Sequence, residues 1–212
     1  MYKFTNIISA YLLIFYYNGI IKFTSSILLL NTILIYLCNV GALNNQSSIN
    51  NSILISLIIV SLSLCINIGQ LSTLDGWMEC VLSTTSAITL CISKLCALLT
   101  ISFIMLCITL PIITIFYDLD INIYRILSYI LVSAFINALI VLFFFIQQYF
   151  NRRGYILSIL ILPLVLPVAM LASMLDNNSL HIVMILGGID MVIIPIIVYI
   201  SSYLSNNIYN FQ

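Results

Sequence analysis

The sequence is poor in charged residues. Of its 212 residues, six are Lys or Arg and six are Asp or Glu, so charged residues make up 6% of the chain and the formal net charge is zero. An average soluble domain has about 25% charged residues, and a nucleic-acid-binding domain needs an excess of basic ones to neutralise phosphates. Hydrophobic residues make up 63% of the chain, and the mean hydropathy is +1.24. This composition excludes a soluble globular enzyme and a nucleic-acid-binding protein, and it predicts a polytopic membrane protein.

Motifs for catalysis and metal binding are also missing. The chain has no Gly-x-x-x-x-Gly-Lys-Ser/Thr loop, no His-Glu-x-x-His and no Cys-x-x-Cys. Its cysteines are scattered through or beside apolar stretches, where a free thiol behaves as a small hydrophobic side chain: Cys38, Cys65, Cys80, Cys91, Cys96 and Cys107. We therefore expect a chain that is not an enzyme and that holds no metal or cofactor of its own.

Long apolar runs predict six transmembrane helices. A helix needs about 20 apolar residues to cross roughly 30 Å of hydrocarbon, and a β-barrel would instead show short alternating strands. The run Ile53–Ile68 is apolar on all sides, which favours helices. We expect an all-α transmembrane domain over residues 1–212, with spans at 23–43, 52–71, 94–117, 124–148, 155–175 and 180–204.

The basic residues set the orientation, because cytoplasmic loops carry an excess of Lys and Arg. If the N-terminus is cytoplasmic, only Arg125 lies outside, and the other basic residues lie inside: Lys3, Lys22, Lys94, Arg152 and Arg153. Both termini are then cytoplasmic. Residues 1–22 are rich in Tyr and Phe, with Asn6 and Ser9 interspersed, which favours a helix lying in the membrane interface over a seventh span.

A polar segment lies between the second and third predicted spans. Asp75 can cap a short helix, Glu79 complements its dipole in the first turn, and Trp77 can anchor it at headgroup level. The segment is therefore either an ordinary interfacial loop or a cytoplasmic coupling helix over 72–88 that presents polar groups to a partner.

The fifth predicted span begins after a basic pair and contains two prolines. Pro163 and Pro167 have no N–H, so the carbonyls of Ile159 and Pro163 lose their helical partners and the helix should kink. The kink is either a matter of packing or a hinge lining the interior of a permease.

Three of these features together resemble the CcmB family. They are Asp75-Gly-Trp-Met-Glu79, the lysine Lys94 that opens the next span, and Arg153-Gly-Tyr-Ile-Leu-Ser-Ile-Leu-Ile-Leu-Pro-Leu-Val-Leu-Pro-Val168. CcmB, the haem exporter protein B, is the six-span permease of the cytochrome c maturation ABC transporter. The resemblance implies a permease that works with a separate ATPase subunit. It implies docking of that subunit through Asp75, Gly76, Trp77 and Glu79, and a hinge involving Arg153, Gly154, Pro163 and Pro167.

The resemblance also implies further partners. These are a haem-presenting membrane protein and a periplasmic haem chaperone, so haem and ATP are handled by the complex, which could hold two permease copies. ATP hydrolysis would drive haem export or release of the loaded chaperone. The expected location is the bacterial inner membrane, or alternatively the mitochondrial inner membrane. The alternative function is a small proton-translocating or assembly subunit of a respiratory complex.

Two single residues bear on these functions. His181, at the outer end of the last span, is either a haem contact or a solvated polar group. Asp190 lies within that span after Gly187 and Gly188, where small residues would let a neighbouring helix approach closely. Since the sequence shows no intramembrane Lys or Arg to pair with it, Asp190 would be protonated or hydrated, as a local polar contact or as a transport site.

Overall fold

The structure, a computed structural model, describes residues 2–17, 19, 26, 53–60, 85–117, 122–150, 155–174 and 180–210. These residues are helical apart from short turns and helix ends, and they contain no strand. The helices with defined bounds are α1 (Tyr2–Tyr17), α5 (Ala87–Tyr117), α6 (Ile123–Phe150), α7 (Tyr155–Ser173) and α8 (Leu180–Asn210), and residues 53–60 are also helical. The expected all-α class is therefore confirmed for the described part of the chain.

Three helices are long and apolar enough to cross a membrane. They are the 26 residues Ala87–Ile112 of α5, the 27 residues Ile123–Tyr149 of α6 and the 27 residues Leu180–Asn206 of α8. At 1.5 Å per residue each measures about 40 Å, which exceeds the roughly 30 Å of bilayer hydrocarbon. These helices support a membrane protein.

The predicted fifth span, 155–175, corresponds to α7, Tyr155–Ser173. Of the first two predicted spans, 52–71 is described only over the helical residues 53–60, and 23–43 lies outside the described residues except for residue 26. The prediction of six spans therefore stays a prediction.

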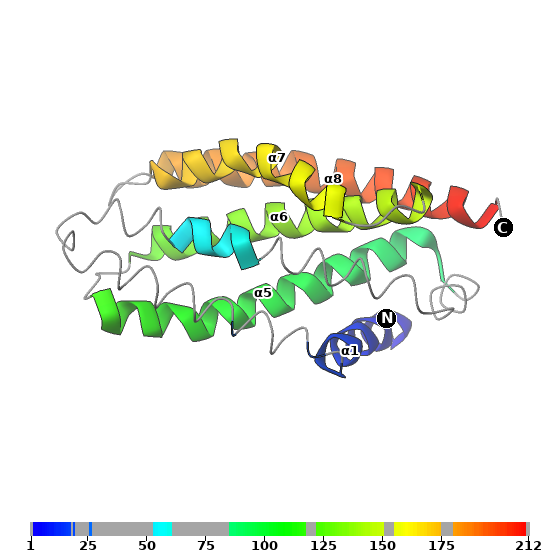
Figure 1. Ribbon diagram of the computed structural model, residues 1–212, viewed down its shortest axis with the longest axis horizontal. Helices are drawn as coiled ribbons and strands as arrows, with labels where there is room; N and C mark the ends of the chain where they lie inside the picture. The colour runs from blue at the N-terminus through cyan, green and yellow to red at the C-terminus, as the bar shows by residue number, and fades with distance from the viewer. Residues whose placement is uncertain are drawn as a thin grey trace.

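The long helices form an elongated bundle in which chain direction alternates. In Figure 1, α5 and α7 run one way along the long axis, and α6 and α8 run the other way. One end of the bundle, the Leu180 end, gathers the last residues of α5 and α7 and the first residues of α6 and α8. The opposite end, the Ala87 end, gathers the start of α5, the helix α1 and the last residues of α8 (Figure 1).

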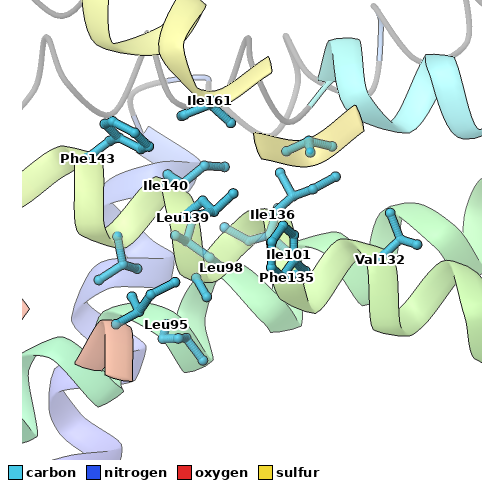
Figure 2. Packing of buried hydrophobic residues seen from close by; sticks show 14 of the residues in the cluster. Leu95, Leu98, Ile101, Val132, Phe135, Ile136, Leu139, Ile140, Phe143 and Ile161 are labelled. Carbon is cyan, nitrogen blue, oxygen red and sulfur yellow. The ribbon is translucent and has the colours of Figure 1, made fainter. Parts of the chain in front are cut away.

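Helix α6 lies at the centre of the bundle. It contacts α5, α7 and α8, and its contact with α8 is the most extensive in the described structure. In its most apolar stretch, 72% is buried inside the protein, against 39% in α5 and 22% in α8. Figure 2 shows the packing: side chains of α5 such as Leu98 and Ile101 face Ile136 and Leu139 of α6, with Ile161 of α7 nearby.

Local hydrogen bonds fix where two of the helices begin. Ser86 precedes α5, and its hydroxyl accepts a bond from the Thr89 N–H at 3.4 Å, as N-cap side chains do. Asn122 precedes α6, and its carbonyl accepts the Arg125 N–H at 3.0 Å. Because α5 begins at Ala87 rather than at residue 94, the last two residues of the predicted coupling helix, 87 and 88, belong to α5.

Helix α1 is attached to the Ala87 end of the bundle. Ile7, Tyr11 and Phe15 recur every four residues and are buried, and α1 contacts α5. Past the end of α1, Gly19 has a φ of 70°, and its N–H donates to the Tyr16 carbonyl at 3.1 Å. A left-handed residue of this kind commonly follows a helix. With 16 residues, α1 is about 24 Å long, less than the hydrocarbon thickness.

Serine and threonine hydroxyls inside the helices mostly bond to carbonyls of their own helix. Ser93, for example, donates to Leu90 O at 2.9 Å, and Thr109 donates to Met105 O at 2.9 Å. One bond instead joins two helices: Asn137 Nδ2 of α6 donates to Ser102 Oγ of α5 at 2.8 Å. Asn137 is almost fully buried, so this bond fixes the register of α5 against α6.

We expect Asn137→Ala and Ser102→Ala each to lower the free energy of unfolding in detergent, and their effects to be less than additive. The coupling should be about 0.6 kcal/mol, the average for interhelical hydrogen bonds in membrane proteins, and at most about 1.7 kcal/mol. A double-mutant cycle followed by unfolding in mixed detergent micelles measures it. Ser133→Ala is the matched control, since Ser133 Oγ bonds Ile130 O of its own helix; strictly additive effects of the pair would contradict the assigned bond.

Candidate functional site

Several of the predicted site residues cannot be placed. Asp75, Gly76, Trp77 and Glu79, which the CcmB resemblance assigns to ATPase docking, lie outside the described residues. The hinge residues Arg153 and Gly154 also lie outside them. Their roles stay predictions.

The two hinge prolines lie inside α7, on its outward side. Pro163 and Pro167 are exposed, whereas Ile161, Val165 and Val168 of the same helix are buried. The proline rings therefore face away from α6 and α8 and do not line an interior space between the described helices. A bend at these prolines would open α7 on its outward side, because that is where the helical hydrogen bonds are missing.

His181 is the second residue of α8 and is exposed. The described residues contain no cluster of three or more His, Cys, Asp or Glu side chains able to hold a metal ion. Its role as a haem contact or as a solvated polar group stays a prediction.

Asp190 lies in the third turn of α8 and is buried, with 6% of its surface exposed. Among the described residues, its Oδ2 atom has no hydrogen-bond partner. The role of Asp190, as a local polar contact or as a transport site, stays a prediction. A Cβ added to Gly187 or Gly188 would have no atom within 4 Å, so open space adjoins these glycines and none of the described helices approaches them closely.

Two basic side chains, which the sequence analysis placed at the ends of predicted spans, are buried inside the protein. Lys94 is only 2% exposed and lies two turns inside α5, not at its first residue. Arg125 is 7% exposed and lies in the first turn of α6. A hydropathy profile does not reveal that these two side chains are buried, because both residues stand at the edges of apolar runs.

Aromatic rings from two other helices surround the ammonium group of Lys94. Its Nζ lies over the Phe144 ring of α6, 5.8 Å from the centroid of the Phe145 ring and 5.9 Å from that of Tyr11 in α1. A cation within about 6 Å of an aromatic centroid is attracted by the negative face of the ring, by about 2 kcal/mol or more when water is excluded. Lys94 thus connects α5 to α1 and α6 at the Ala87 end.

This aromatic cluster, made of Lys94, Tyr11, Phe144 and Phe145, is a structural feature that the sequence analysis missed. A sequence signal exists: Ser86-x-x-Thr89 can begin a helix seven residues before Lys94, so that the lysine falls inside it. The aromatic partners carry no such signal, since Tyr11 is separated from Lys94 by more than eighty residues and Phe144 by fifty.

An apolar groove lies between α5 and α6. It has a volume of about 450 Å³ and is lined by Leu99, Thr100, Phe103, Ile104, Leu106, Ile130 and Ser133. The hydroxyls of Thr100 and Ser133 bond carbonyls of their own helices. Since no polar groups converge in the groove, it lacks the features that orient a polar ligand.

Comparison with known proteins finds two bacterial relatives. An uncharacterized protein of Rickettsia prowazekii (strain Madrid E) is 28% identical over 204 residues, which cover 91% of this chain and 91% of the relative. An uncharacterized protein of Rickettsia conorii (strain ATCC VR-613 / Malish 7) is 31% identical over 140 residues, which cover 64% of this chain and 65% of the relative. No family model and no solved structure matches.

The aromatic cluster can be tested by a double-mutant cycle. We expect Phe144→Leu, which keeps the side chain apolar but removes the ring, to destabilise the protein more in the presence of Lys94 than in a Lys94→Met background. The difference should be about 1–2 kcal/mol, the range of a desolvated cation–π contact. Unfolding in detergent measures all four variants.

Phe143→Leu is the matched control for this cycle, since Phe143 is equally buried in α6 but its ring is not part of the aromatic cluster around Lys94. If Phe144→Leu costs the same stability with lysine or methionine at position 94, the ring does not hold the ammonium group.

Proposed function

We propose that this chain is the membrane permease subunit of an ABC transporter complex for cytochrome c-type biogenesis. In this proposal a separate subunit hydrolyses ATP, and the permease converts its closure into helix motion that drives haem export or release of a haem-loaded chaperone. The starting point is the resemblance to CcmB at Asp75–Glu79, Lys94 and Arg153–Val168. The apolar helices support the membrane part of the proposal, because three of them are long enough to cross a bilayer.

The observation that best supports the coupling role is the position of α5. This helix begins at Ala87, eight residues after Glu79, the last of the residues that the resemblance assigns to ATPase docking. A displacement of those residues would therefore reach the first turn of α5 through a short stretch of chain. An extended helix transmits such a push along its length because its backbone hydrogen bonds hold it rigid.

The aromatic cluster supplies a route from α5 to the rest of the bundle. Lys94 contacts the rings of Tyr11 in α1 and of Phe144 and Phe145 in α6. Because α6 also contacts α7 and α8, a movement of α5 at the Ala87 end would reach every long described helix through α6. The two prolines of α7 would let that helix bend at its outward side as the others move.

The arrangement of the helix ends is compatible with one cytoplasmic face. The start of α5, α1 and the end of α8 lie at the Ala87 end (Figure 1), which is where the positive-inside rule assigns the cytoplasm. The proposal keeps the six-span topology, in which α1 lies at the membrane interface. The relatives from Rickettsia favour a bacterial inner membrane over a mitochondrial one.

One observation favours the alternative, a proton-translocating or assembly subunit of a respiratory complex. Such subunits carry ionisable residues inside the membrane, and this structure buries Asp190, Lys94 and Arg125 in apolar helices. These residues lie on three different helices, α8, α5 and α6, and Lys94 is held by aromatic rings. We rank the permease first because Lys94 is one of the three features by which this chain resembles the CcmB family.

Affinity purification in a mild detergent tests the partner. We expect the tagged chain to recover a small ABC ATPase, identified by mass spectrometry, and haem proteins detected by their absorbance. A Trp77→Ala/Glu79→Lys variant should lose the ATPase, since it removes an interfacial anchor and reverses a charge of the docking segment. Recovery should fall at least about tenfold, because losing one buried contact pair costs more than 1.4 kcal/mol.

The control for this purification is His181→Ala, at the opposite end of the bundle, which should retain the ATPase. Recovery of respiratory-complex subunits without an ATPase would overturn the permease proposal and support the alternative.

The orientation can be tested with single cysteines in a background in which the six native cysteines are replaced. A cysteine at Thr84 should react with an impermeant maleimide only in inside-out vesicles, and a cysteine at His181 only in intact cells. The reason is that Thr84 stands three residues before α5 in the chain, whereas His181 lies at the opposite, Leu180 end of the bundle. Labelling of Thr84→Cys from outside would contradict docking of a cytoplasmic ATPase.

A further inference from the structure

Asp190 is a buried carboxyl that neither the permease proposal nor any described polar contact uses. It is 6% exposed, and its Oδ2 atom has no hydrogen-bond partner among the described residues. Ionisable residues inside membrane helices are costly and rare, and they mark functional sites such as proton relays. We propose that Asp190 is a proton-binding site inside the membrane that exchanges its proton with the Leu180 side.

The choice of a proton over a metal cation follows from the number of available ligands. A sodium or divalent ion needs several oxygen ligands, as Ca²⁺ and Mg²⁺ sites illustrate. No described cluster of three His, Cys, Asp or Glu side chains exists, and the buried hydroxyl oxygens of Ser201 and Ser205 lie eleven and fifteen residues further along α8. A proton needs only the one oxygen that Asp190 provides.

The charged and titratable groups on the neighbouring helices are few. Helix α8 packs against α5, α6 and α7, and the buried groups among them are Lys94 and Cys91 in α5 and Arg125 and Tyr129 in α6. Lys94 and Cys91 lie towards the Ala87 end. Arg125 and Tyr129 lie in the first two turns of α6, nearer the Leu180 end than Asp190 is. On α7, the titratable residue is Tyr155, its first residue, at the Ala87 end.

The route to the carboxyl favours the Leu180 end. Asp190 is ten residues, or about 15 Å, from the start of α8 and twenty residues, or about 30 Å, from its end. Helical side chains lean towards the preceding turn, which here contains Gly187, where open space replaces a side chain. The same face of α8 is lined by buried side chains in both directions, Val183 and Leu186 towards the Leu180 end and Ile197 and Ser201 towards the Ala87 end. The shorter distance, with the open space at Gly187, therefore favours the Leu180 end.

A membrane-permeant carbodiimide tests the site directly. Dicyclohexylcarbodiimide adds to a protonated carboxyl: the acid proton moves to a carbodiimide nitrogen, the oxygen bonds the central carbon, and rearrangement leaves an N-acylurea that carries the reagent's full mass. We expect this mass on Asp190 in the reconstituted full-length chain at pH 5, and at least about tenfold less at pH 9, because the reagent adds only to the protonated acid.

Two variants keep the result interpretable. Asp190→Asn is close in shape to the protonated acid, so it should fold normally and carry no label, and Asp190→Glu should keep the label. An unlabelled Asp190 at pH 5, or equal labelling at both pH values, would overturn the proposal.

The side of exchange is tested in sealed vesicles with a pH gradient of pH 5 against pH 9. Labelling should follow the pH on the side where a His181→Cys variant reacts with impermeant maleimide. Labelling that follows the other side would overturn exchange with the Leu180 side. Since the readout is the mass of residue 190 in the isolated chain, the result does not depend on whether an ATPase binds.

Discussion

The structure depends on one constraint, which is that polar groups inside apolar helices must find partners within the protein, because hydrocarbon offers none. The backbone meets this constraint by forming helices, and most Ser and Thr hydroxyls meet it by bonding carbonyls of their own helix. Asn137 meets it through Ser102 of α5, and Lys94 through aromatic rings of α1 and α6. These two contacts hold specific helices together, whereas apolar packing alone would allow them to slide.

Two parts of the bundle differ in how they satisfy this constraint. At the Ala87 end, the Lys94 ammonium is surrounded by rings, so three helices are joined where the predicted cytoplasmic partner would bind. In α8, the Asp190 carboxyl has an oxygen with no described partner, beside open space at Gly187. The first arrangement favours transmission of force, and the second favours exchange of a small ligand. A permease can contain both, since coupling and proton binding would act at different depths of the bundle.

Much of the fold could be predicted from the sequence. The apolar run predicted at 155–175 is α7 at Tyr155–Ser173, and the runs at 124–148 and 180–204 lie within α6 and α8. These predictions succeed because a helix in hydrocarbon needs a continuous apolar stretch of fixed length. The start of α5 was predicted at 94 instead of Ala87, since a hydropathy window treats lysine as a boundary whatever its surroundings.

The sequence by itself therefore determined the class of this protein: helical, apolar and long enough to cross a membrane in at least three places. The tertiary structure alone decided which faces of those helices are buried. It put α6 at the centre, turned Pro163 and Pro167 outward, and buried Lys94 among rings from distant parts of the chain. The physical reason is that these helices are apolar on nearly all sides, so their sequences carry little amphipathic pattern to orient them, and only contacts between helices choose the face that each one buries.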